Sequence, residues 1–132
     1  MDPAHKIETL RWCGDATGYL VLIDQTRLPY EFATVELASC AAVVAAIRTM
    51  QVRGAPLIGV AGAYGLALAL RDAAGDAALE AAFEQLNAAR PTAVNLRWAL
   101  DRMLARLRPI DAADRLAAAY AEAASIADED AE

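Results

Sequence analysis

The chain has 132 residues, a length that suits one domain and excludes two. It is 58% hydrophobic and rich in alanine, the best intrinsic helix former, which excludes disorder for most of the chain and favours helices. Twelve basic and eighteen acidic residues give a net charge of -6, without the basic footprint that phosphate backbones or anionic membranes require. We therefore expect no nucleic acid and no membrane among its partners.

The first 38 residues have the pattern of a strand meander, with short apolar runs separated by turn residues. In the last run, Ala33, Val35 and Leu37 alternate with polar residues and would share one face of a strand. A sheet of this size needs a second layer to cover it. The sequence predicts a three-stranded antiparallel sheet with strands at residues 7–12, 19–24 and 33–37.

After Ser39 the hydrophobic period changes from two to 3.6, which predicts helices for the rest of the chain. Ser39, Asp76 and Thr92 are suitable N-caps, and Pro56 is suitable as the first residue of a helix. The predicted helices span about 39–51, 56–74, 76–89, 92–108 and 111–127, and the acidic end after residue 127 is expected to fray. The fold class is therefore α+β, mainly α, with residues 1–38 and 39–132 forming one domain.

The segment 55–70 contains no charged residue, yet it is shorter than the roughly 20 residues that span a bilayer. Gly59, Gly62 and Gly65 recur at every third position and give a surface of small residues on which another backbone can approach closely. We therefore predict that the second helix is buried at the centre of a water-soluble bundle.

Two arginines precede predicted helix starts. Arg53 is followed by Gly54 and Ala55 at the start of the second helix, and Arg90 is followed by Pro-Thr before the fourth. The first N–H groups of a helix lack partners and attract anions, and an arginine beside them can bind two oxygens of a phosphate. In the alternative, each arginine neutralises the C-terminus of the preceding helix. The residues alone leave both interpretations open.

No catalytic constellation and no metal-ligand spacing is apparent elsewhere. His5 is the only histidine and lies in a polar N-terminal segment, so we expect it to be solvated. Cys13 and Cys40 have no histidine partner, although the first turn of a helix at Cys40 favours a lowered thiol pKa. We expect reduced, inert thiols, no cofactor and no metal. Trp12 and Trp98 are predicted to pack in the core.

Three blocks of the sequence resemble a known family. They are LRW at 10–12, IRTMQVRGAP at 47–56 and RPTAVNL at 90–96, with WA at 98–99. Together they are similar to the N-terminal domain of the methylthioribose-1-phosphate isomerase family, from about Leu10 to Met103. That family more loosely resembles ribose-1,5-bisphosphate isomerases and the regulatory subunits of the eukaryotic translation initiation exchange factor.

The resemblance implies an aldose–ketose isomerase of methionine salvage, acting on S-methyl-5-thioribose 1-phosphate without a metal or organic cofactor. It implies substrate contacts by Arg53, Gly54, Ala55 and Arg90, which are the residues that the helix-start argument selects. It also implies a cytoplasmic location and a homodimer for the complete enzyme.

Family members are longer than this chain. A C-terminal Rossmann-like domain carries their catalytic cysteine and aspartate, and neither Cys13 nor Cys40 lies at the position of that cysteine. The resemblance thus implies an N-terminal portion that needs the C-terminal domain, in cis or in trans, and that is inactive alone. In the alternative, the chain is a non-catalytic binding or regulatory module of the same superfamily. The intact arginine blocks favour the isomerase.

Overall fold

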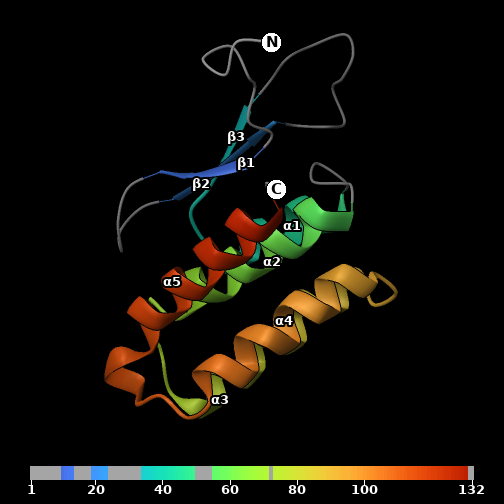
Figure 1. Ribbon diagram of the computed structural model, residues 1–132. Coiled ribbons are helices and arrows are strands. Elements are labelled where there is room, and N and C mark those ends of the chain that lie inside the picture. Colours follow the sequence, from blue (N-terminus) through green and yellow to red (C-terminus); the bar gives the residue numbers. More distant parts are fainter. Residues whose placement is uncertain (1–9, 14–18, 24–33, 50–54, 72, 131–132) are drawn as a thin grey trace, which may run out of the picture.

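The computed structural model describes residues 10–13, 19–23, 34–49, 55–71 and 73–130. Within them the mainly helical α+β class with five helices is confirmed (Figure 1). The elements are, in chain order, β1 (Leu10–Cys13), β2 (Tyr19–Ile23), β3 (Thr34–Leu37), α1 (Cys40–Arg48), α2 (Ala55–Ala69), α3 (Asp76–Ala89), α4 (Val94–Leu107) and α5 (Ala112–Asp130). His5 lies outside the described residues.

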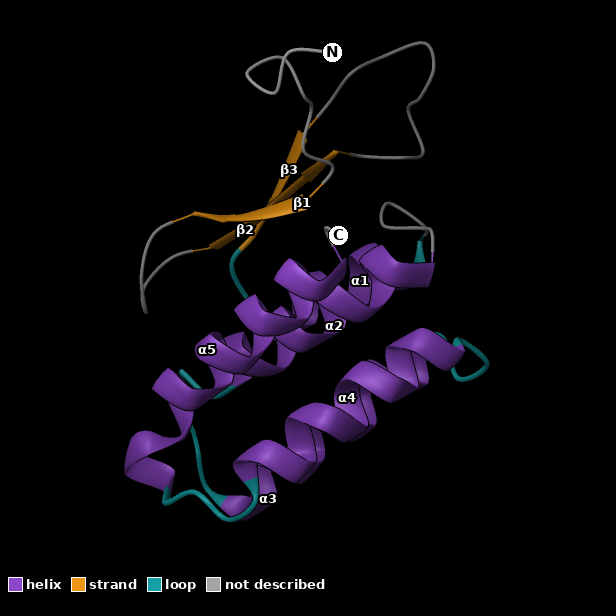
Figure 2. Ribbon diagram, in the orientation of Figure 1, coloured by secondary structure: helices purple, strands orange, loops and turns teal. Residues whose placement is uncertain are grey.

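The strands pair antiparallel in the order β1-β2-β3 and lie to one side of the helices (Figure 2). Leu20 of β2 is paired with Leu37 of β3, and both side chains are buried. The neighbouring Glu36 is exposed, as the alternation in this strand predicts. The sheet therefore adds the Leu20–Leu37 pair to the helical core.

The first helix begins as predicted, because the Ser39 hydroxyl accepts a hydrogen bond of 3.1 Å from the Ala42 N–H. It ends at Arg48, earlier than predicted. Thr49 adopts a non-helical conformation, and its hydroxyl donates to the Ala45 carbonyl at 2.8 Å. Threonine side chains that bond back to the preceding turn in this way compete with continuation of the helix.

Helix α2 is the centre of the bundle, with α1, α3, α4 and α5 packed around it. All residues from 58 to 68 are buried, which confirms the prediction for this helix. It begins at Ala55, one residue before Pro56, and it ends at Ala69 instead of residue 74. Its last turn tightens, since the Leu70 and Arg71 N–H groups donate to carbonyls three residues back. Within the described chain, no helix is both long enough and apolar enough to cross a bilayer.

The predicted caps of α3 and α4 are each wrong by one residue. Gly75 is the N-cap of α3, because the Asp76 carboxylate instead accepts a 2.7 Å hydrogen bond from Arg115. Ala93 is the N-cap of α4, because its N–H donates to the Arg90 carbonyl in a turn that places Thr92 outside the helix. Local cap preferences are overridden here by a tertiary contact and by a turn.

Candidate functional site

Helices α2 and α4 run in the same direction with their first turns side by side. A Cβ at Gly59 would lie 3.0 Å from the Asn95 carbonyl oxygen, and one at Gly62 would overlap Leu96. Glycine at position 59 therefore allows the close approach of the α4 backbone, and glycine at position 62 leaves room for the Leu96 side chain. Both helix N-termini, with their unpaired N–H groups, consequently lie at one end of the bundle, which we call the open end (Figure 1).

Two of the predicted site residues can be placed at the open end. Ala55 is the first residue of α2, and Arg90 follows the last residue of α3, where the chain turns into α4. Arg90 has an extended, non-helical backbone, with φ -145° and ψ 77°. Arg53 and Gly54 lie outside the described residues. The structure thus supports the pairing of the two helix starts without placing the first arginine.

Arg90 carries a buried guanidinium nitrogen, Nη1, for which the described part of the chain provides no hydrogen-bond partner. An arginine acting only as a helix cap would donate to the last carbonyls of α3, and this nitrogen makes no such bond. A buried unpaired donor destabilises a fold by about 1–3 kcal/mol. Nη1 is therefore suited to an acceptor from outside the described residues, such as a phosphate oxygen.

Asn87 is a further candidate that the sequence did not suggest. Its side-chain oxygen is buried and also has no hydrogen-bond partner. Asn87 lies in the last turn of α3, three residues before Arg90. Its position three residues before Arg90 is the one signal in the sequence that could have pointed to Asn87. A buried amide oxygen of this kind can accept a hydrogen bond from a ligand hydroxyl.

A cavity of about 280 Å³ opens between α2, α4 and α5 near the same end. It is lined by Gly59, Val60, Asn95, Trp98, Ala99, Ile126 and Glu129. Trp98 is 54% exposed, so its predicted place in the core is wrong. Leu96, Ala99 and Leu100 fill the buried face of α4 and leave Trp98 on the cavity rim. The side chain of Trp12 lies outside the described residues.

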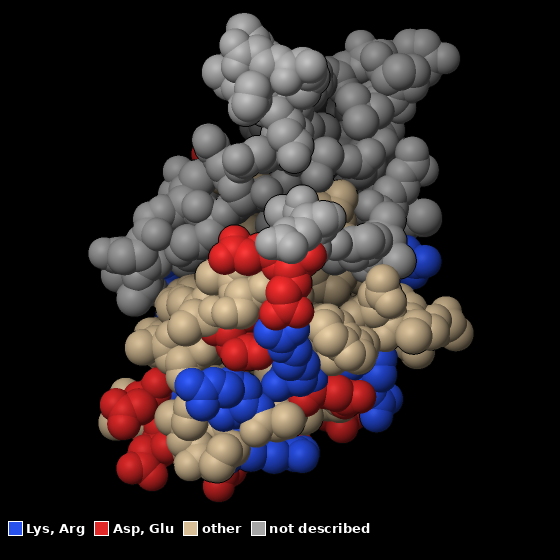
Figure 3. Space-filling view, in the orientation of Figure 1, with Lys and Arg blue, Asp and Glu red and all other residues tan. Residues whose placement is uncertain are grey.

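Arg102 holds the end of α5 against α4. Its guanidinium bonds Glu122 at 2.6 Å and both carboxylate oxygens of Glu129, at 2.6 and 2.9 Å. Hydrogen bonds from Glu129 and Glu122 raise the pKa of Arg102, and the same contact lowers the pKa of Glu129. Figure 3 shows acidic and basic side chains together on this face. The acidic end of α5 therefore stays helical to Asp130, contrary to the predicted fraying.

Burial disfavours a nucleophilic role for the thiol of Cys40, the cysteine whose side chain the structure describes. Cys40 is buried, and burial raises the pKa of its thiol to about 11, so the predicted effect of the helix dipole is wrong. Its Sγ lies 3.9 Å from Gln85. Among the described side chains, no three histidine, cysteine or acidic residues are grouped to hold a metal ion. The side chain of Cys13 is not among those described.

Comparisons with known proteins agree on the family. The model of the Initiation factor 2 subunit family matches residues 51–132. The chain is 60% identical over 111 residues to the methylthioribose-1-phosphate isomerase of Methylorubrum populi, covering 84% of this chain and 30% of that protein. It is 57% identical over 119 residues to the isomerase of Paramagnetospirillum magneticum, covering 90% and 33%. The chain thus spans about one third of the length of these relatives.

Two solved structures share the fold. The crystal structure of 5-methylthioribose 1-phosphate isomerase from Pyrococcus horikoshii superposes with a TM-score of 0.84 at 33% identity, covering 95% of this chain and 37% of that one. The translation initiation factor eIF-2B subunit delta from A. fulgidus superposes with a TM-score of 0.78 at 32% identity, covering 94% and 37%.

Proposed function

Since the chain belongs to the Initiation factor 2 subunit family, we propose that it is the N-terminal portion of a methylthioribose-1-phosphate isomerase. The relatives that support this activity are 57–60% identical to the chain and carry that name. The complete enzyme converts an aldose phosphate to the ketose phosphate in the cytoplasm. Residues 1–132 form its single N-terminal domain, and a C-terminal Rossmann-like domain, in cis or in trans, supplies the catalytic residues. The complete enzyme is a homodimer and uses no cofactor.

The role we propose for this chain is to bind and orient the phosphorylated sugar. The observation that carries the proposal is the buried, unpartnered Nη1 of Arg90 at the end where α2 and α4 both begin. Arg53, Gly54 and Ala55 complete the site at the start of α2. Helix N–H groups and two guanidinium groups together neutralise a phosphate and fix the sugar in one orientation.

The test uses a chimera in which this chain replaces the aligned N-terminal part of the M. populi isomerase. We expect Arg90→Lys and Arg53→Lys each to weaken substrate binding by about 1.5–3 kcal/mol, because lysine cannot bind two oxygens with one planar group. The melting temperature should stay nearly unchanged. Arg106→Lys, at a half-exposed position further along α4, is the control and should alter neither quantity.

Two results would contradict the substrate site. If Arg90→Lys lowers the melting temperature while the affinity is unchanged, the arginine stabilises a helix end and does not bind substrate. If Arg106→Lys weakens binding as much as Arg90→Lys, the loss reflects total charge. The isolated chain should show no isomerase turnover above a buffer control.

A second function is a non-catalytic regulatory module. The likeness to an initiation-factor subunit, with a TM-score of 0.78, favours it. The chimera separates the two functions. Aldose–ketose turnover by the chimera supports the isomerase, whereas sugar-phosphate binding without turnover supports the module.

A further inference from the structure

The exposed apolar surface of the open end lies on one face of α4. Val94 is 78% exposed and Trp98 is 54% exposed, and among the described residues these two are the exposed large hydrophobic side chains. They are four residues apart and therefore neighbours on the helix surface. The cavity lined by Trp98 and Ile126 adjoins them. We call Val94, Trp98 and this cavity the Trp98 face.

The Trp98 face is held in place before any partner arrives. The Arg102 guanidinium lies over the Trp98 ring, 5.5 Å from its centroid. Arg102 is itself fixed by Glu122 and Glu129 of α5, at 2.6 Å each. A tryptophan that is both exposed and immobilised loses little conformational entropy on binding, which is characteristic of the central residue of an interface.

We propose that the Trp98 face docks the C-terminal portion of the same isomerase, and that an apolar side chain of that portion enters the cavity. The inference rests on the proposed function. The relatives are about three times as long as this chain, so most of their length is available to cover the surface. The cavity volume of about 280 Å³ suits one or two apolar side chains.

The position of α5 favours this occupant over a second copy of the chain. Ile126 and Glu129, near the end of α5, line the cavity. In the proposed isomerase, a C-terminal portion joined to α5 starts beside the rim of the cavity, so a short connection brings it onto the face. A tethered portion has a high effective concentration and outcompetes a second molecule.

The experiment measures thiol labelling at position 94. Val94→Cys is introduced into the chain and into the chimera with the M. populi isomerase, and maleimide labelling is followed by peptide mapping, which separates this site from Cys13 and Cys40. We expect labelling in the chimera to be slower by at least about tenfold. Val44→Cys is the matched control, since Val44 lines a separate groove between α1 and α3 with Arg48 and Gln85. Its labelling rate should be the same in both proteins.

A second variant tests the anchor. Adding Trp98→Ala to the chimera that carries Val94→Cys should restore most of the labelling rate of the isolated chain, because the anchor of the interface is lost. If the chimera does not fold, the M. populi isomerase with cysteine at the position aligned with Val94 replaces it. Slow labelling there that becomes fast on substitution of the aligned residue 98 gives the same support.

Three outcomes would overturn the proposal. Equal labelling of position 94 in chain and chimera shows that the face stays open. Protection in the isolated chain that rises with protein concentration assigns the face to a second copy, and protection that needs the sugar phosphate assigns the cavity to the ligand. An active chimera with position 94 fully labelled refutes the docking surface alone, whereas a protected but inactive chimera refutes the isomerase alone.

Discussion

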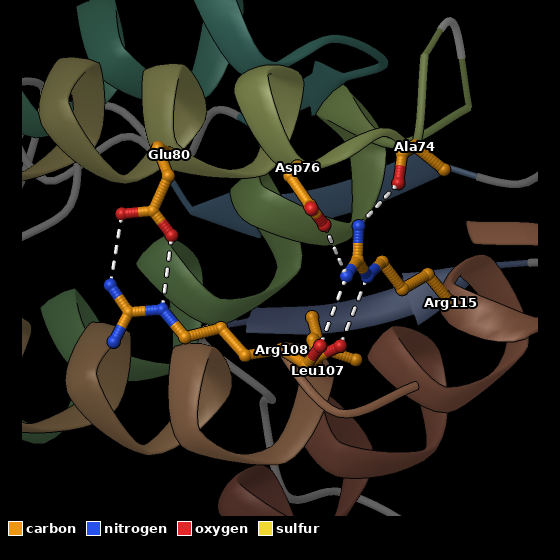
Figure 4. Close-up of polar contacts among 6 residues, drawn as sticks. All are labelled: Ala74, Asp76, Glu80, Leu107, Arg108 and Arg115. Carbon is orange, nitrogen blue, oxygen red and sulfur yellow. Dashed lines mark hydrogen bonds and ion pairs between the residues drawn. The ribbon is translucent and has the colours of Figure 1, made fainter. Parts of the chain in front are cut away.

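The two ends of the helix bundle use arginine in opposite ways. At the closed end, where α4 leads into α5, Arg115 is only 3% exposed. Its guanidinium donates to the carbonyls of Leu107, Arg108 and Ala74 and to the Asp76 carboxylate, at 2.7–3.1 Å (Figure 4). This side chain donates to carbonyls at the end of α4 and joins them to the start of α3. The closed end is built for stability.

At the open end, Arg90 has a buried nitrogen with no partner, and Trp98 is half exposed beside a cavity. Both features lower the stability of the isolated domain. Binding sites commonly retain such unfavourable groups, because a ligand or a partner satisfies them. The hydrogen bonds that each arginine makes within the fold therefore distinguish the structural role of Arg115 from the binding role proposed for Arg90.

The largest effect is expected from Arg115→Met. The change leaves the carbonyls of Arg108 and Ala74 without this donor inside the fold, whereas the Leu107 carbonyl keeps the Ile110 N–H, so we expect a loss of about 2–4 kcal/mol in the free energy of unfolding. Urea denaturation followed by circular dichroism measures it. Arg108→Met is the control, because its ion pair with Glu80 is exposed on the surface. A loss from Arg115→Met no larger than that of the control would contradict the structural role.

The packing of α2 against α4 is tested by Gly62→Leu. A side chain at position 62 would overlap Leu96, so α4 must move away from α2, and we expect a loss of about 1–3 kcal/mol. Gly75→Ser is the control, since no atom lies within 4 Å of a Cβ there. A Gly62→Leu protein that is as stable in urea as the control would contradict the close packing of α2 against α4.

The open end should respond to Arg90→Met in the opposite direction from Arg115→Met. Removing an unpaired buried donor should leave the free energy of unfolding within about 0.5 kcal/mol of the parent or raise it. The same urea titration measures this change. A loss close to that of Arg115→Met would mean that Arg90 is structural and that the contrast between the two ends fails.

Most of the fold could be predicted from the sequence because it depends on local patterns. The change of period at Ser39 predicted where the helices begin, and the uncharged run from 55 to 70 predicted the buried centre. The ends of the helices were harder to predict. The bond between Asp76 and Arg115 joins residues 39 apart in the chain, and no local rule anticipates such a contact.

The candidate site could be predicted in part for the same reason. Arg90 was selected because a helix start is a local feature, whereas Asn87 was missed because only the folded structure shows that its oxygen is buried without a partner. Trp98 was assigned to the core from its residue type, although it is half exposed at the rim of the cavity between α2, α4 and α5. Burial depends on which helix packs on which face, and that information is not local.

The smallest effect concerns acid at the open end. The bond to Arg102 holds the pKa of Glu129 below its usual 4.5, so this pair stabilises the end of α5 above pH 4.5 and is lost as the pH falls through the lowered pKa. The carboxylate is exposed, so the effect is local. In a Trp12→Phe background, where Trp98 is the remaining tryptophan, its fluorescence should change below pH 4.5 as Arg102 is released from Glu129.

Two variants decide whether that transition belongs to the open end. Glu129→Gln should remove most of the fluorescence change, because the group that titrates is gone. Glu80→Gln should leave it intact, although Arg108 lowers the pKa of Glu80 in the same way, because that pair is remote from Trp98. The two carboxylates thus have the same chemistry and differ in place. A transition of full amplitude in Glu129→Gln would mean that Trp98 responds to acid unfolding of the whole bundle. The ion pair between Arg102 of α4 and Glu129 of α5 would then have no separate role in holding the Trp98 face.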